Sequence, residues 1–121
     1  MKQQEKDLLF CDLSARLPYR LKYCTNIDID GMRFSTMTID SIKLVLSGEY
    51  KPYLRPMSSM TTKEKEEYDS CRKHLCDEYN RYCFDSVESI DWLNAHHFDY
   101  RGLIDKGIAL EAPEGMYNQQ N

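Results

Sequence analysis

The sequence predicts a single α+β domain: an N-terminal helix, a three- to four-stranded antiparallel meander, a long amphipathic helix and a short C-terminal helical corner. Two stretches, 3–17 and 61–83, repeat apolar residues at spacings of three and four, which is the period of a helix. The stretch between them is rich in β-branched and aromatic residues and in turn signals. A chain of 121 residues is long enough for one domain with one core.

The first helix is predicted over residues 3–17, because leucines recur on one face and Pro18 cannot continue it. Residues 19–23 then alternate aromatic or aliphatic side chains with basic ones. This period of two is typical of a strand, with the tyrosines on the buried face and Arg20 and Lys22 on the opposite face.

Three further extended segments complete the predicted meander. Asp30-Gly31 is the strongest hairpin signal, and a second strand follows over 32–39. A third strand is predicted over 42–46. Residues 49–56 contain two prolines, which favour extended backbone at a sheet edge, where a missing N–H donor is harmless. A helix followed by such a bent meander is also how small barrel folds begin.

The long helix is predicted to begin at Thr61, because Thr61 and Glu64 have the spacing of a capping box. It should continue to about Cys83, with one face packed on the sheet. The residues of that face are Tyr68, Cys71, Leu75, Tyr79 and Tyr82.

The C-terminal corner is predicted from two capping residues. Asp85, answered by Glu88, would begin a short helix that ends near His97. Asp99 would cap a second helix over about 100–106, which Gly107 ends in a left-handed conformation. Residues 118–121 are expected to fray, and the whole chain, 1–121, forms one domain.

Composition narrows the class of protein. Hydrophobic residues make up 41% and charged residues 30%, as in ordinary globular proteins. No apolar run approaches the ~20 residues that span a bilayer, and the polar N-terminus lacks a signal-peptide core. We therefore expect a cytoplasmic protein with no membrane partner.

The charge distribution and the cysteine content lead to expectations about nucleic-acid binding and about the state of the thiols. Residues 1–60 have nine Lys/Arg against seven Asp/Glu, a charge of +2, whereas residues 61–121 have seven against thirteen, a charge of −6, so the second half is the acidic one. This acidity argues against a nucleic-acid protein as a whole. The five cysteines include no C-x-x-C pair, which favours reduced, half-buried thiols over disulfides or zinc ligands.

One stretch near the C-terminus concentrates chemically versatile side chains. The candidate catalytic residues are His96, His97, Asp99 and Arg101. His97 and Asp99 resemble half of a metal site, for which Glu111 or Glu114 would be the third ligand. Alternatively, a histidine acts as a general base that Asp99 orients. We favour a third interpretation, a structural corner, because one H-x-D is a common accident.

Two other surfaces are candidates for binding. The cations Arg20, Lys22, Lys51 and Arg55 are interleaved with tyrosines, which is the combination that binds single-stranded nucleic acid. The second is the loop Pro52–Met60, which is rich in the residue types of interface centres. Its members are Tyr53, Leu54, Arg55, Met57 and Met60. The competing hypothesis is that this segment is a structural crossing, in which Arg55 pairs with a carboxylate of the acidic half.

Three stretches, Leu13–Tyr19, Lys51–Met60 and Asp91–Tyr117, resemble a group of short uncharacterised proteins common in gut Bacteroidales genomes and their phages. The resemblance implies a bacterial or phage cytosol and no particular reaction, cofactor or catalytic residue. Residues 27–49 are the least typical of the group.

No nucleophile-and-base signature, glycine-rich phosphate loop or paired carboxylates at motif spacing are present, which argues against an enzyme. The sequence therefore predicts a non-enzymatic interaction protein without a cofactor. Its partner is unknown, and a second copy of the chain is one candidate. Single-stranded nucleic-acid binding, and a metal- or His-dependent hydrolase at His96, His97 and Asp99, are the alternatives.

Overall fold

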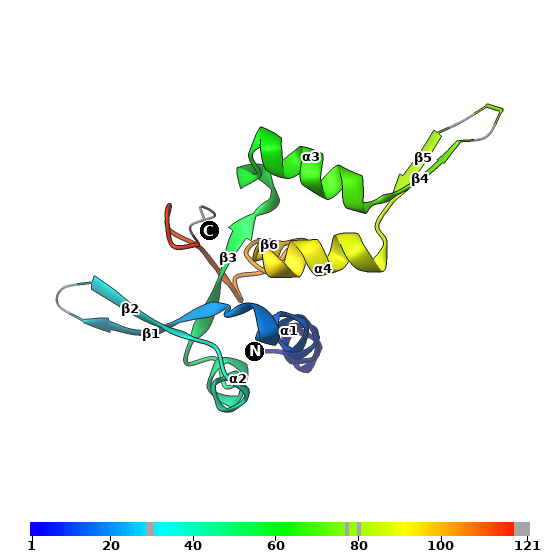
Figure 1. Cartoon of the computed structure of the whole chain (residues 1–121). Helices are drawn as coiled ribbons and strands as arrows, with labels where there is room; N and C mark the ends of the chain where they lie inside the picture. The colour runs from blue at the N-terminus through cyan, green and yellow to red at the C-terminus, as the bar shows by residue number, and fades with distance from the viewer. Residues whose placement is uncertain (29–30, 77, 80, 118–121) are drawn as a thin grey trace.

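The computed structural model describes residues 1–28, 31–76, 78–79 and 81–117, and within them the chain is a mixed α+β structure (Figure 1). The α-helices are α1 (Gln3–Arg16), α2 (Ile39–Leu46), α3 (Thr62–Cys71) and α4 (Val87–Ala95). The strands are β1 (Lys22–Asp28), β2 (Gly31–Thr36), β3 (Lys51–Pro56), β4 (Lys73–Cys76), β5 (Arg81–Phe84), β6 (Phe98–Asp99) and β7 (Leu110–Glu111). None of the described helices is both long and apolar enough to cross a lipid bilayer.

The main sheet is organised around β3. Its order is β2-β1-β3-β6, with β7 also paired to β3. The β1–β2 and β1–β3 pairs are antiparallel, whereas β6 and β7 pair with β3 in parallel. The predicted meander or small barrel is therefore wrong, because three of the strands that pair with one another come from distant parts of the chain. The edge position predicted for residues 49–56 is also wrong, since β3 has neighbours on both sides.

The helix predicted over residues 3–17 is confirmed as α1, which contributes two leucines to the hydrophobic core. Leu9 and Leu13 are fully buried and pack with the sheet residue Leu54 and with Val45 of α2. After α1, a 3-10 turn (Leu17–Tyr19) leads into β1, which begins three residues later than predicted. Burial of large aliphatic side chains on one helix face is the main term that holds α1 to the sheet.

Helix α2 replaces the strand predicted over 42–46. Thr38 caps it, because its hydroxyl accepts from the Ser41 N–H while the Ser41 hydroxyl accepts from the Thr38 N–H. Ile42 and Val45, three residues apart, are the buried pair. A short apolar run fits a strand or a helix equally by periodicity alone; the capping box stabilises the start of the helix, and burial of Ile42 and Val45 in the core favours the helix.

The predicted long helix is wrong beyond Cys71. The Thr61–Glu64 capping box is confirmed, but Arg72 already has extended backbone, and β4 and β5 form a separate two-stranded sheet. Asp77 and Asn80, whose types favour turns, lie between the two strands in sequence but outside the described residues. The side chains predicted as a buried stripe are instead exposed or half-exposed.

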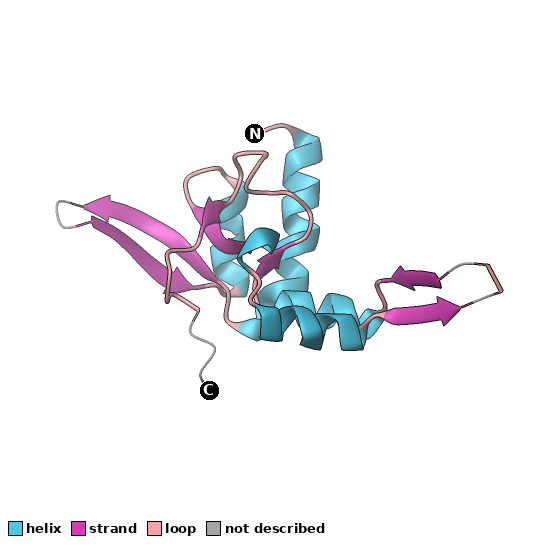
Figure 2. Ribbon diagram, turned by 90° about the horizontal axis from the view of Figure 1, so that it is seen from above, coloured by secondary structure: helices cyan, strands magenta, loops and turns pink. Residues whose placement is uncertain are grey.

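We call residues 73–84, which comprise β4, β5 and their connection, the arm. The arm and the β1–β2 hairpin project from opposite ends of the molecule, as two views at right angles show (Figures 1 and 2). The Asp30-Gly31 signal placed Gly31 in the turn, but Gly31 begins β2 and pairs with Asp28; residues 29–30 are outside the described part of the chain. The frayed tail predicted over 118–121 also lies outside it.

The C-terminal corner differs from the prediction in its caps. Ser86, and not Asp85, caps α4, and it is answered by Ser89 and not by Glu88. Asp99 does cap the following segment, since its carboxylate accepts from the Leu103 and Ile104 N–H groups at 2.9 Å. That segment consists of hydrogen-bonded turns and not of a helix, and Gly107 ends them with the expected positive φ of 78°.

Candidate functional site

The two adjacent histidines of the C-terminal corner face different environments. His96 is the C-cap of α4, where its ring stacks on Trp92 with centroids 4.0 Å apart and its Nδ1 lies 2.9 Å from the Trp92 carbonyl oxygen. His97 has a left-handed backbone (φ 65°), is buried, and stacks on Tyr117 with centroids 3.8 Å apart. The chain therefore turns sharply between them, and the two rings are held by different aromatic partners.

The environment of His97 makes it a poor base. Burial, followed by the positive charges of Arg16, His96, Arg55 and Lys22, lowers the pKa of the imidazole to about 3. A general base is efficient when its pKa lies near the working pH, so His97 is far too weak at neutral pH. Its Nδ1 has no hydrogen-bond partner among the described residues.

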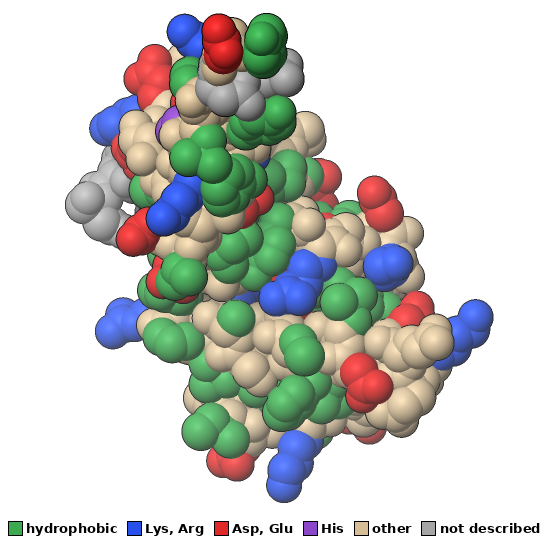
Figure 3. Space-filling view, turned by 90° about the vertical axis from the view of Figure 1, so that its right-hand side faces the viewer, with side chains coloured by type: hydrophobic (Ala, Val, Ile, Leu, Met, Phe, Trp, Pro, Cys, Tyr) green, Lys and Arg blue, Asp and Glu red, His purple; other side chains and the backbone are tan. Residues whose placement is uncertain are grey.

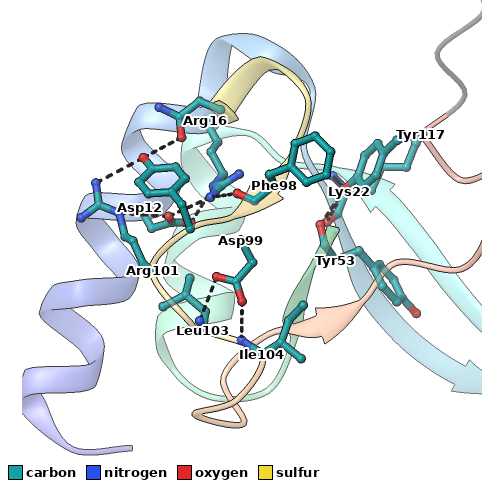
Figure 4. Close-up of polar contacts among 12 residues, drawn as sticks. Asp12, Arg16, Lys22, Tyr53, Phe98, Asp99, Arg101, Leu103, Ile104 and Tyr117 are labelled. Carbon is teal, nitrogen blue, oxygen red and sulfur yellow. Dashed lines mark hydrogen bonds and ion pairs between the residues drawn. The ribbon is translucent and has the colours of Figure 1, made fainter. Parts of the chain in front are cut away.

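The side chains of Asp99 and Arg101 make structural contacts within the protein (Figure 4). Both carboxylate oxygens of Asp99 are taken up by the backbone N–H groups that they cap. Arg101 points the other way, toward α1, where its Nε lies 3.2 Å from the buried Asp12 carboxylate. The hypothesis of a catalytic or metal site at His96, His97, Asp99 and Arg101 is not supported by this geometry.

Asp12 is the centre of a buried polar network that attaches α1 to the corner. Its carboxylate accepts from Arg16 at 2.8 and 3.1 Å, and Arg16 also donates to the Phe98 carbonyl oxygen at 2.6 Å. The Tyr100 ring lies beside the guanidinium groups of both Arg16 and Arg101, 5.2 Å from each. A buried network of this kind rigidifies the junction between distant chain segments.

The C-terminal segment is fastened to the sheet by one tyrosine. The Tyr117 hydroxyl accepts from the Lys22 N–H and donates to the Tyr53 carbonyl oxygen, both at 2.8 Å (Figure 4). A cavity of about 560 Å³ lies between this segment and the start of α3, where Glu111 and Glu114 contribute to its wall together with Arg55. The predicted partners of these acidic residues, His97 and Asp99, do not line it.

The predicted interaction segment around Arg55 is a structural crossing. Tyr53, Leu54 and Met60 are buried, and Met57 is half-buried. Arg55 donates to both carboxylate oxygens of Glu64 at 2.8 Å, and its guanidinium lies 4.1 Å from the centre of the Phe98 ring. Arg55 lowers the pKa of Glu64 to about 2. The second of the two sequence hypotheses for this segment therefore fits the structure.

The residues of the predicted nucleic-acid surface are accessible only in part. Arg20 and Lys51 are exposed, Lys22 lies over the ring of Phe34 at 5.2 Å, and Arg55 is neutralised by Glu64. Of the four interleaved tyrosines, Tyr23 and Tyr53 are buried in the core, whereas Tyr19 and Tyr50 are half-buried beside the exposed Arg20 and Lys51. A base-stacking site requires exposed rings next to unpaired cations, so this arrangement gives the hypothesis little support.

The feature that sequence reasoning missed is the arm. Its strands alternate between two faces, because His74 pairs with Cys83 and Leu75 with Tyr82. One face, which we call the apolar face, carries Leu75, Tyr82 and Phe84, together with Lys73, which pairs with Phe84. The opposite face, which we call the thiol face, carries His74, Cys76, Arg81 and Cys83. The alternation His74-Leu75-Cys76 and Tyr82-Cys83-Phe84 was the available signal, hidden by its overlap with a helical spacing.

All five cysteines lie among the described residues and are thiols, as predicted. The expectation that they are half-buried holds for Cys71 alone, since Cys24 is buried and the other three are exposed. A comparison of the chain with family models, with curated proteins and with solved structures finds no match. The resemblance to Bacteroidales and phage proteins therefore stays a prediction.

Proposed function

We propose that this protein is an interaction module that associates with a second copy of itself through the apolar face of the arm. The observation that carries the proposal is the exposure of large apolar side chains on this one element. Leu75, Tyr82 and Phe84 are 55%, 50% and 43% exposed, and Val87 at the base of the arm is 77% exposed.

The apolar face continues onto the body of the molecule. A shallow groove of about 520 Å³ at the base of the arm is lined by Phe84, Val87 and Ile90 and by the charged residues Lys73, Asp85 and Asp91. Viewed from this side, hydrophobic side chains are visible on the arm and on the body below it (Figure 3). An apolar centre with a charged rim is the usual anatomy of a protein interface.

The stability of the arm supports a covering partner. A two-stranded ribbon is marginally stable in water unless a further layer covers one face, and both strands of the arm are exposed along their length. Ribbon edges are also ready to pair with another chain.

Charge and area favour a second copy as that partner. Residues 72–85 carry three basic and three acidic side chains, so two arms meet without the net repulsion expected between chains of charge −4. The four exposed side chains offer roughly 100 Å² each, or on the order of 400 Å² of apolar surface per chain. With a polar rim this approaches the ~800 Å² per partner of a standard interface.

Sedimentation velocity across a concentration series tests the proposal. The native chain should show a monomer–dimer equilibrium in the micromolar range. Leu75→Lys combined with Phe84→Lys should be monomeric throughout, because it places two charges in the apolar centre of each copy. Phe10→Lys is the matched control, since Phe10 is 51% exposed on α1, outside the arm, and this variant should dimerise like the native chain.

Circular dichroism and the fluorescence of Trp92 establish that each variant is folded. A native chain that stays monomeric up to roughly 0.5 mM would refute self-association. An arm variant that dimerises as well as the Phe10→Lys control would equally refute the assignment of the apolar face.

A further inference from the structure

The thiol face of the arm meets the end of α3 at a cluster of three chemically different side chains. Asp69 lies in the last turn of α3, His74 in β4 and Cys83 in β5. Strand pairing sets His74 directly opposite Cys83, and Asp69 approaches both from the helix. One potential ligand atom from each residue lies within 4.8 Å of the other two.

Two of the separations in this cluster, measured to different oxygens of Asp69, are close to those of a coordination sphere. Cys83 Sγ lies 3.7 Å from Asp69 Oδ1, and His74 Nε2 lies 3.9 Å from Asp69 Oδ2. In a tetrahedral site with bonds of about 2.0–2.3 Å, neighbouring ligand atoms are roughly 3.3–3.7 Å apart. Because the three ligand atoms lie within 4.8 Å of one another, the cluster needs a contraction of up to about one ångström, which exposed side chains can make by rotating.

We propose that Asp69, His74 and Cys83 bind a Zn²⁺ ion, with water as the fourth ligand. A thiolate, an imidazole and a carboxylate together form a donor set that suits Zn²⁺ better than Mg²⁺ or Ca²⁺, which prefer oxygen ligands alone. The carboxylate and the thiolate balance the two charges of the ion.

Two local interactions must change when the ion binds. His74 Nε2 lies 2.7 Å from the Asp69 carbonyl oxygen, and coordination through this nitrogen replaces that hydrogen bond. Partial shielding from water, together with Asp69, raises the pKa of the Cys83 thiol, although Arg72 acts in the opposite direction. Loading therefore releases a proton from Cys83 and becomes tighter as the pH rises.

The same three residues do not suit thiol catalysis. The Cys83 thiol donates to the Asp69 carboxylate and not to His74, and its raised pKa disfavours the thiolate nucleophile. Metal binding instead fits the position of the cluster, because an ion there connects α3, β4 and β5. Such an ion would strengthen the attachment of the ribbon to α3, to which His74 and Cys83 already connect it through Asp69.

Cobalt is a suitable spectroscopic probe, because Co²⁺ occupies zinc sites and a thiolate ligand gives it a near-ultraviolet charge-transfer band. The native chain should bind one Co²⁺ with that band, and Zn²⁺ should displace it. Cys83→Ser should lose the band, and Cys83→Ser and His74→Gln should each weaken Zn²⁺ binding at least about tenfold. Cys76→Ser is the matched control, since Cys76 is exposed on the same face but outside the cluster.

The titrations are run on the native chain and on the Leu75→Lys/Phe84→Lys variant, whose changes lie on the other face of the arm. Equal Zn²⁺ affinity in both supports a site within one chain, whatever the outcome of the dimerisation test. A native chain that gives neither a cobalt band nor heat with Zn²⁺ at neutral pH would refute the site. Equal losses in Cys76→Ser and Cys83→Ser would refute it as well.

Discussion

Replacing Arg55 with alanine should destabilise the fold strongly, because it leaves the buried Glu64 carboxylate without its cation. The side chains of Arg55 and Glu64 are 14% and 9% exposed, and two hydrogen bonds of 2.8 Å join them. The pKa of Glu64 falls from 4.5 to about 2, chiefly because of the hydrogen bonds from Arg55. At 1.36 kcal/mol per pKa unit, the folded state favours the charged carboxylate by about 3 kcal/mol.

This magnitude agrees with the ~3–5 kcal/mol lost when one partner of a buried ion pair is removed. At about 4 °C per kcal/mol for a chain of this length, Arg55→Ala should melt roughly 12 °C below the native chain at pH 7. The measurement is thermal unfolding followed by circular dichroism. Lys51→Ala, which removes an exposed cation from the same strand, should melt within about 2 °C of the native chain.

The pH dependence provides a second check. A carboxylate whose pKa is depressed in the folded state stabilises the fold above its unfolded pKa, and this stabilisation disappears as the pH falls through the folded pKa. The difference between the native chain and Arg55→Ala should therefore be constant at neutral pH and shrink between about pH 4.5 and pH 2. If Arg55→Ala has the same melting temperature as the native chain at pH 7, the assignment of a structural role to Arg55 is wrong, and the hypothesis that it contacts a partner is favoured instead.

Three further predictions concern the caps and the core. Tyr117→Phe removes the hydroxyl that bridges Lys22 and Tyr53, so chemical denaturation should show a loss of about 1–2 kcal/mol, and an unchanged midpoint would contradict the bridge. Thr38→Ala should cost about 1 kcal/mol in the same assay, whereas Thr38→Ser should retain the cap of α2; equal losses in both would argue against capping. His97, whose pKa is lowered to about 3, should show no titration in proton NMR between roughly pH 8 and pH 5, and a midpoint near 6.5 would contradict its burial. Since its folded pKa lies below the unfolded one, His97 makes the fold less stable as the pH falls below about 6.5.

Several elements could be predicted from the sequence because short-range chemistry decides them. Thr61 and Glu64 form a capping box by spacing alone, and the prolines of residues 49–56 exclude a helix there. The positive φ of Gly107 follows from its lack of a Cβ, and the Asp99 cap follows from its reach to nearby N–H groups.

The structural role of Arg55 was one of two sequence hypotheses, and local information does not choose between them. Its partner Glu64 lies nine residues away, and the Phe98 ring that it covers lies further along the chain. The choice depended on β3 becoming the strand to which β6 and β7 also pair. A sequence read in short windows does not contain that pairing.

By itself, the sequence determined the mixed α+β class and the local signals that begin or end several elements, because those depend on neighbours within about four residues. Only the tertiary structure decided that residues 39–46 form a helix and that the strands within residues 73–84 form an exposed ribbon. In both stretches the spacing of apolar residues fits a helix and a strand, and long-range packing breaks the tie. The same packing places Arg55, His97 and Asp99 in buried or half-buried positions. The apolar face and the thiol face of the arm likewise form only when β4 pairs with β5, which the sequence pattern did not reveal.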